Sequence, residues 1–139
     1  MYQRILLAFD GSREGRVALT EGIELAALCK AEVHLLSVLE MTGARAMEAG
    51  LHPHEADHFQ RFLDEGLEQL RRKGVEEPVG HFASGPPAEH IARLARHIDA
   101  DLVVVGHRHR GLLARWWQGS TSQQLLDHAD CSILVAFER

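Results

Sequence analysis

The residues most suited to binding a charged group lie between Val103 and Leu126. A run of valines ends at Gly106, and a cationic loop with alternating histidine and arginine follows it. Further on, Gly119 precedes three hydroxyl residues at the start of a predicted helix. Glycine lets backbone approach a ligand closely, and free N–H groups at a helix start attract phosphate oxygens. The segment therefore predicts an anion site; the alternative is a solvated loop and ordinary helix-capping residues. The polar residues involved are His107, Arg108, His109, Arg110, Ser120, Thr121 and Ser122.

Two familiar phosphate loops do not fit this segment. Gly106 and Gly111 have the G-x-x-x-x-G spacing, but leucines follow where a P-loop needs Lys and Ser or Thr. No G-x-G-x-x-G follows a predicted strand, so a dinucleotide cofactor is not expected. The carboxylate of Asp10 after the first predicted strand also argues against an FMN phosphate loop.

Catalytic and metal-ligating residues are not predicted. No nucleophile and base are paired by their spacing. His54 and His58 would share a helix face if a helix began near Pro53, and with His52 or Asp57 they could hold zinc or copper. Since no fourth ligand is evident, solvated histidines are the favoured interpretation. Cys29 and Cys131 are expected to be buried thiols, and two cysteines fit a reducing compartment.

The elements that position these residues alternate along the chain. Short apolar runs without period-two alternation predict strands buried on both faces. Longer stretches with apolar residues at helical spacing predict helices between them, and Gly74 predicts the end of the second. The predicted strands are Ile5 to Phe9, Val33 to Leu39, Pro78 to Ala83, Leu102 to Val105 and Ile133 to Phe137. The predicted helices contain Val17 to Leu28, Phe59 to Leu70, Ile91 to Ile98 after Pro86 and Pro87, and Leu125 to Ala129.

This alternation predicts a parallel sheet covered by helices on both faces. The stretch from Met41 to Glu55 is expected to be a long loop. In such sheets ligands bind beyond the carboxyl ends of the strands, where the strand order reverses. The candidate positions are therefore Asp10 to Ser12, Ser37 to Glu40, Ser84 and Gly85, and the segment from Gly106 onward.

Length and composition bound the kind of protein. The chain has 139 residues, enough for one domain, here residues 1–139. Its formal net charge is -5, whereas a general nucleic-acid binder usually carries the opposite sign. Among its cations only Lys30 and Lys73 are lysines. The first apolar run is too short for a signal peptide, and no window approaches a membrane span. We therefore expect a cytoplasmic protein that binds neither membrane nor nucleic acid.

Taken in order, several segments of the chain resemble the universal stress protein family. The resemblance covers nearly the whole chain and rests on the order and spacing of the segments together. It implies an α/β fold: a single-domain, three-layer α/β/α, Rossmann-like structure with a five-stranded parallel sheet of strand order 3-2-1-4-5. Many members of the family bind ATP, and some bind no nucleotide. The segments are Ile5 to Ser12, Val33 to Val38, Gly85 to Glu89, Asp101 to Gly106, Gly119-Ser120 and Leu125 to Val135.

The family's nucleotide motif is a glycine, two residues, a second glycine, nine residues, and then Gly-Ser or Gly-Thr. Gly106 and Gly119-Ser120 match it, and His109 stands where the second glycine is expected. By resemblance, Asp10 would contact the ribose or phosphates of ATP, with Mg²⁺ as a possible companion, and the backbone of Val38 would contact adenine. The other nucleotide-binding residues expected are Gly11, Ser12, His107, Arg110, Thr121 and Ser122.

The last predicted strand, Ile133 to Phe137, is expected at a sheet edge. A bare apolar edge invites pairing, and the resemblance implies that the same strand of a second copy covers it in a homodimer. The leading hypothesis is a regulatory module that binds ATP and hydrolyses it slowly at most. Two alternatives stay open: a nucleotide-free member that acts through protein–protein contacts, favoured by His109, and a nucleotidyl transferase, whose substrate residues are not evident.

Overall fold

The structure is a computed structural model, and it describes residues 1–9, 15–39, 53–85, 87–107 and 129–137. In this part of the chain strands and helices alternate up to the fourth strand, as the sequence predicts. The elements are β1 (Arg4–Phe9), α1 (Gly15–Cys29), β2 (Glu32–Leu39), α3 (Pro53–Arg72), β3 (Val79–Ser84), α4 (Pro87–His97), β4 (Leu102–His107) and β5 (Ser132–Phe137).

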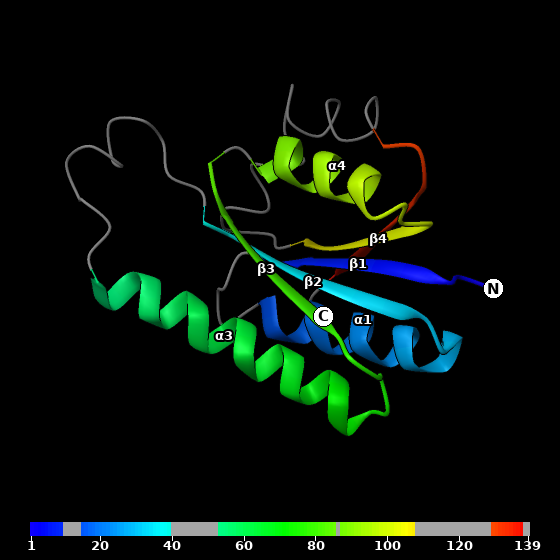
Figure 1. The fold of residues 1–139 in the computed structure, drawn as a ribbon, viewed down its shortest axis with the longest axis horizontal. Helices are drawn as coiled ribbons and strands as arrows, with labels where there is room; N and C mark the ends of the chain where they lie inside the picture. Colours follow the sequence, from blue (N-terminus) through cyan, green and yellow to red (C-terminus); the bar gives the residue numbers. More distant parts are fainter. Residues whose placement is uncertain (10–14, 40–52, 86, 108–128, 138–139) are drawn as a thin grey trace.

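The strands form one parallel five-stranded sheet in the order β3-β2-β1-β4-β5 (Figure 1). The chain builds outward from β1 through β2 to β3 and then crosses to β4 on the other side of β1. The strand order therefore reverses between β1 and β4. The predicted strand order is confirmed, and β5 lies at an edge of the sheet as expected.

Helices cover both faces of the sheet, which confirms the three-layer arrangement. Figure 1 shows α1 and α3 on one side and α4 on the other. Side chains at alternate positions of β1 divide between the layers: Leu7 belongs to the cluster with α1 and α3, and Leu6 to the cluster with α4. From Ile5 to Phe9 every residue of β1 is exposed by 4% or less. Burial on both faces explains why these strands are continuous apolar runs.

Helix α3 ends at Gly74 as the sequence predicts. The N–H of Val75 donates to the carbonyl of Leu70 at 3.0 Å, and the N–H of Gly74 donates to that of Arg71 at 3.0 Å. Gly74 has φ +92, so the chain leaves the helix through a left-handed residue in a Schellman motif. Val75 and Leu70 also share the core, which is the apolar contact that accompanies this motif.

Helices α1 and α4 end in the same way without glycine. Lys30 has φ 53 and Asp99 has φ 55. The amide after each of them donates to the carbonyl five residues earlier. The backbone of both residues is therefore in the left-handed conformation, which L-residues adopt at a cost of about 1–2 kcal/mol.

At the amino edge of the sheet, Asp101 joins β4 to β1. Its carboxylate accepts hydrogen bonds from the backbone N–H groups of Gln3 at 2.8 Å and Arg4 at 3.0 Å. The Arg4 guanidinium donates to the carbonyl of Ile98 and pairs with Glu32, each at 2.9 Å. These contacts tie β1, β2, β4 and the end of α4 together.

Three expectations need correction. The predicted loop from Met41 to Glu55 is too long, because α3 already begins at Pro53, a residue well tolerated in a first helical turn. Ala129, expected in the last helix, lies outside any helix; the remainder of that helix falls outside the described residues. Cys29 and Cys131 are partly exposed rather than buried, because Cys29 ends α1 and Cys131 precedes β5.

Within the described residues, no helix combines the length and the apolar character needed to cross a membrane.

Candidate functional site

The carboxyl edge of the sheet brings together two of the segments that the sequence singled out. The pairing of β1 with β4 ends at Ala8 and Val105, and the chain leaves β1 after Phe9. Because the two strands are neighbours and parallel, their carboxyl ends lie side by side. This is also the place where the strand order reverses, which is the usual ligand position in an open α/β sheet.

Val38 and Gly106 lie near the carboxyl ends of the strands on either side of β1. The described part of β1 ends at Phe9, which is paired with Ser37, and β2 runs to Leu39. On the other side, β4 runs through Gly106 to His107, and the pairings described for these two residues are with β5. Val38 and Gly106 are therefore placed on the two strands next to β1, at the carboxyl edge of the sheet.

Val38 combines a core side chain with this edge position. Its side chain is 0% exposed and packs in the cluster on the α4 face of the sheet. On the β3 side it is paired with Ala83. The side chain therefore serves the core, while the backbone is placed at the edge where a ligand of the predicted kind would lie.

Strand β4 is longer than its sequence predicts. The apolar run stops at Val105, but the strand includes Gly106 and His107, which pair with Ala136 and Phe137. Gly106 is thus fixed in a strand at the point where the cationic segment begins.

Ser37 is a polar residue that sequence analysis included among the strand-end positions without assigning it a role. It is 0% exposed, and its Oγ has no hydrogen-bond partner among the described residues. An unsatisfied buried hydroxyl costs about 1–3 kcal/mol. Ser37 is paired with Phe9 in the last described pair of the β1–β2 ladder.

Most of the other predicted site residues lie outside the described part of the chain. They are Asp10, Gly11, Ser12, His109, Arg110, Gly119, Ser120, Thr121 and Ser122. The histidine group is only partly described: His54 and His58 both fall in α3, so they are four residues apart in one helix, and His52 precedes the helix. In the described part of the chain, no group of three or more histidine, cysteine or carboxylate side chains could hold a metal ion.

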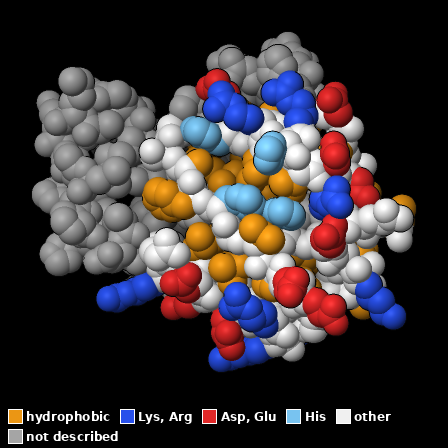
Figure 2. Space-filling view, in the orientation of Figure 1, with side chains coloured by type: hydrophobic (Ala, Val, Ile, Leu, Met, Phe, Trp, Pro, Cys, Tyr) orange, Lys and Arg blue, Asp and Glu red, His pale blue; other side chains and the backbone are white. Residues whose placement is uncertain are grey.

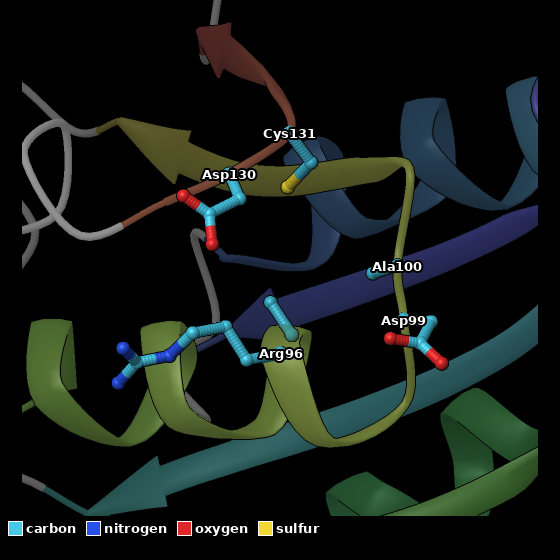
Figure 3. A pocket seen from close by; sticks show the side chains of 6 residues that line it. Arg96, Asp99, Ala100, Asp130 and Cys131 are labelled. Carbon is cyan, nitrogen blue, oxygen red and sulfur yellow. The ribbon is translucent and has the colours of Figure 1, made fainter.

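Two hollows open at the amino edge, away from the candidate site. One, of about 380 Å³, lies between the end of α4 and the start of β5 and is lined by Arg96, Asp99, Asp130 and Cys131 among others. Figure 3 shows the side chains of Asp130 and Cys131 extending from the segment before β5 toward α4. Burial, with added repulsion from Asp101 and Asp130, raises the pKa of the Cys131 thiol. A thiol that stays protonated is a poor nucleophile, so the raised pKa argues against a nucleophilic role for Cys131.

The other hollow, of about 720 Å³, lies at the starts of β2 and β3. Both lysines of the chain, Lys30 and Lys73, line it together with Glu32, Glu76 and Glu77. Each lysine follows the end of a helix, where a positive charge interacts favourably with the helix dipole. Their placement is therefore explained by the helix ends without a ligand.

Comparison with known proteins identifies the family of this chain. The model of the Universal stress protein family matches residues 1–136. The chain belongs to the universal stress protein family.

Relatives and solved structures agree with this assignment. A putative universal stress protein of Staphylococcus aureus strain USA300 is 28% identical over 138 residues, covering 96% of this chain and 83% of the relative. The structure of universal stress protein UspA from Lactobacillus plantarum is 26% identical, with a TM-score of 0.77 and 97% of each chain covered. The universal stress protein from Archaeoglobus fulgidus in complex with dAMP is 20% identical, with a TM-score of 0.67, covering 96% of this chain and 97% of that one. This last similarity establishes the shared fold.

Proposed function

We propose that this universal stress protein binds an adenine nucleotide, ATP in the first instance, at the carboxyl edge between β1 and β4. The observation that carries the proposal is the reversal of strand order between β1 and β4, with Val38 on β2 and Gly106 on β4 at the carboxyl ends of the strands on either side of β1. The dAMP complex of the Archaeoglobus fulgidus family member supports the choice of an adenine nucleotide.

In the proposed site, the backbone of Val38 contacts adenine and Asp10 contacts the ribose or phosphates. Gly106 and Gly119 line the phosphates, and the hydroxyls after Gly119 donate hydrogen bonds to them. N–H groups at a helix start and nearby cationic side chains favour the negative charge. The phosphates would order the segment after β4 and change the surface offered to partners, and hydrolysis is slow at most.

The test is a thermal shift with ATP and Mg²⁺. We expect Tm to rise at millimolar ATP, because a ligand that binds the folded state alone stabilises it. The Ser120→Ala variant should reduce the shift, since it removes a proposed phosphate donor. Ser132→Ala is the matched control, because Ser132 is exposed at the start of β5, at the opposite end of the sheet from the proposed site, and it should keep the full shift. No rise in Tm for the wild-type chain would contradict the proposal.

A second function is favoured by His109. A side chain in place of the motif's second glycine narrows the space for phosphate, and a position that needs positive φ costs a histidine about 1–2 kcal/mol. The alternative is a nucleotide-free member that acts through protein–protein contacts. The His109→Gly variant separates the two: a shift with ATP that appears in the variant alone assigns the loss of binding to this residue.

We also infer that two copies of the chain pair through β5 and that the protein is cytoplasmic. Strand β5 is an edge strand whose residues, Ser132 to Phe137, carry no charge, and Leu134 is 40% exposed. Uncharged apolar edges are prone to pair with another strand. Antiparallel pairing of two identical edges would give a two-fold dimer.

A further inference from the structure

Two histidines on neighbouring strands face one another through their ring nitrogens. Nδ1 of His34 on β2 lies 2.9 Å from Nε2 of His81 on β3. The ring centroids are 5.1 Å apart and the ring planes differ by 18°. The distance between the ring centroids is much larger than the distance between the two nitrogens, so the rings meet edge to edge. Because their planes differ by only 18°, they are nearly coplanar. The contact is therefore an in-plane hydrogen bond between two imidazoles.

Such a bond depends on the number of protons in the pair. One nitrogen must donate and the other must accept, and a neutral imidazole has one nitrogen of each kind. The bond can form when both rings are neutral, and it becomes charge-assisted when one ring is protonated. When both rings are protonated, two N–H groups and two positive charges face each other. The second proton therefore replaces the bond with a repulsion.

The surroundings oppose the charged forms. Burial lowers the pKa of His34, as do the charges of His81 and Arg4, while Glu32 acts in the opposite direction. Burial also lowers the pKa of His81, helped by His97 on α4.

Other charges lie near the pair on its amino-edge side. Lys30 at the end of α1, and Lys73, Glu76 and Glu77 between α3 and β3, line the hollow that His34 also lines. These groups are of mixed sign. Figure 2 shows several histidine side chains close together on the face it presents, with apolar side chains among them.

The bond joins β3 to the rest of the sheet. Strand β3 is an edge strand that pairs with β2 alone, and none of its residues is buried. Val79 and Phe82 are 44% and 42% exposed. A cross-strand bond therefore supplies a larger share of the anchoring here than it would in β1, which is buried on both faces.

We propose that His34 and His81 form an acid-sensitive clasp, which holds β3 on β2 while the pair carries at most one extra proton and releases it when the second proton binds. The proposal is independent of nucleotide binding. Because β3 leads through Ser84 into α4, release would loosen the strand that precedes this helix.

The sign of the pH effect follows from proton linkage. A histidine that binds its proton less readily in the folded state than in the unfolded chain makes acidification favour unfolding. The contribution of such a histidine to the free energy of unfolding is fully present above the unfolded pKa of about 6.5, and it is lost as pH falls below that value. For the wild-type chain we expect the urea midpoint to fall between about pH 7.5 and about pH 5.5.

The His34→Gln/His81→Gln double variant tests this contribution. Glutamine can keep a hydrogen bond between the strands but does not titrate, so the midpoint should fall much less on acidification. The matched control is His90→Gln. His90 lies on α4 and its Nε2 contacts the carbonyl of Ser84 at 3.0 Å, outside the pair, so this variant should keep the wild-type pH dependence. An equal acid response in the double variant and the wild type would overturn the proposal.

Hydrogen exchange locates the effect in the strand. After correction for the intrinsic pH dependence of exchange, amides of β3 that bond to β2 should lose protection at the lower pH in the wild type, while those of β1 should not. In the double variant β3 should keep its protection. Unchanged β3 protection in the wild type at both pH values would overturn the clasp.

A measurement on the unaltered protein covers the case in which the double variant does not fold. NMR titration of the imidazole nitrogens should show two separated protonation steps for the pair, the second at clearly lower pH. Two independent steps, each near the ordinary histidine pKa of about 6.5, would overturn the proposal.

Discussion

At the scale of single residues, Asp101 shows how one carboxylate can position two strands. It accepts hydrogen bonds from the consecutive backbone N–H groups of Gln3 and Arg4 at the start of β1, while its own N–H donates to the Arg4 carbonyl at 2.9 Å. The main-chain ladder and the side chain thus fix the same register between β1 and β4. Since these two strands flank the candidate site, the alignment of their far ends depends on this contact.

The Asp101→Ala variant should therefore be clearly destabilised. Loss of two hydrogen bonds to a partly exposed charged group predicts a decrease of about 2 kcal/mol in the free energy of unfolding. Urea denaturation at neutral pH measures it. Asp64→Ala is the control, because Asp64 makes an exposed contact with Gln60 within α3; its effect should stay within about 0.5 kcal/mol. Equal effects of the two substitutions would contradict this role.

Ser37 predicts a change of the opposite sign. The Ser37→Ala variant removes a fully buried hydroxyl that has no partner among the described residues, and it should raise the free energy of unfolding by about 1 kcal/mol. Thermal and urea unfolding provide the measurement, with the exposed Ser84→Ala as a control expected to be near neutral. A loss of stability in Ser37→Ala would show that the hydroxyl has a partner.

At the scale of elements, three described helices end in left-handed residues of different types. Gly74 adopts this conformation without steric cost, whereas Asp99 and Lys30 do not. The carboxylate of Asp99 also lies at the negative end of the α4 dipole, which is unfavourable for a negative charge. The end of α4 is thus less favourable in sequence than the end of α3, although the hydrogen bonds are the same.

A reciprocal pair of substitutions tests this difference. Asp99→Gly should stabilise the protein by about 1 kcal/mol, and Gly74→Ala should destabilise it by about 1 kcal/mol. An added Cβ at Gly74 meets nothing within 4 Å, so the cost would come from the backbone alone. Urea midpoints of both variants against the wild type check the signs. Changes of the same sign would contradict the explanation.

The elements themselves were largely predictable from sequence because both faces of the sheet are covered. Unbroken apolar runs marked β1 and β4, a largely apolar run without period-two alternation marked β2, and glycine marked the end of α3. The last two residues of β4 were missed because Gly106 and His107 end the apolar run, while their strand conformation depends on pairing with β5. The partner of His81 was missed because it lies 47 residues away and depends on strand register. Val38 and Gly106 were identified by resemblance, and the sequence pattern alone could not show that their strands are the two neighbours of β1.

At the scale of the whole molecule, the sheet has two uncharged edges with different exposure. Strand β3 exposes Val79 and Phe82 and carries the clasp residue His81, and β5 exposes Leu134 and has no lysine, other charge or proline. Natural edge strands are usually protected by such residues. The absence of this protection from Ser132 to Phe137 is the basis for expecting a second copy at β5.

Leu134→Lys should therefore reduce the assembly to single chains. A charge on the paired edge disfavours strand pairing, so light scattering should give the mass of one 15.5 kDa chain instead of two. Leu28→Lys is the control, because Leu28 is 82% exposed on α1, and it should leave the mass unchanged. A wild-type chain that is already monomeric would contradict the dimer.

The position of the two lysines has a practical consequence. They line the hollow at the starts of β2 and β3. Both lysine amines are therefore at the end of the sheet opposite to Val38 and Gly106. Amine coupling to a biosensor chip would attach the protein with a uniform orientation and leave the opposite end facing the flow, so ligand injections could be carried out without engineering a tag.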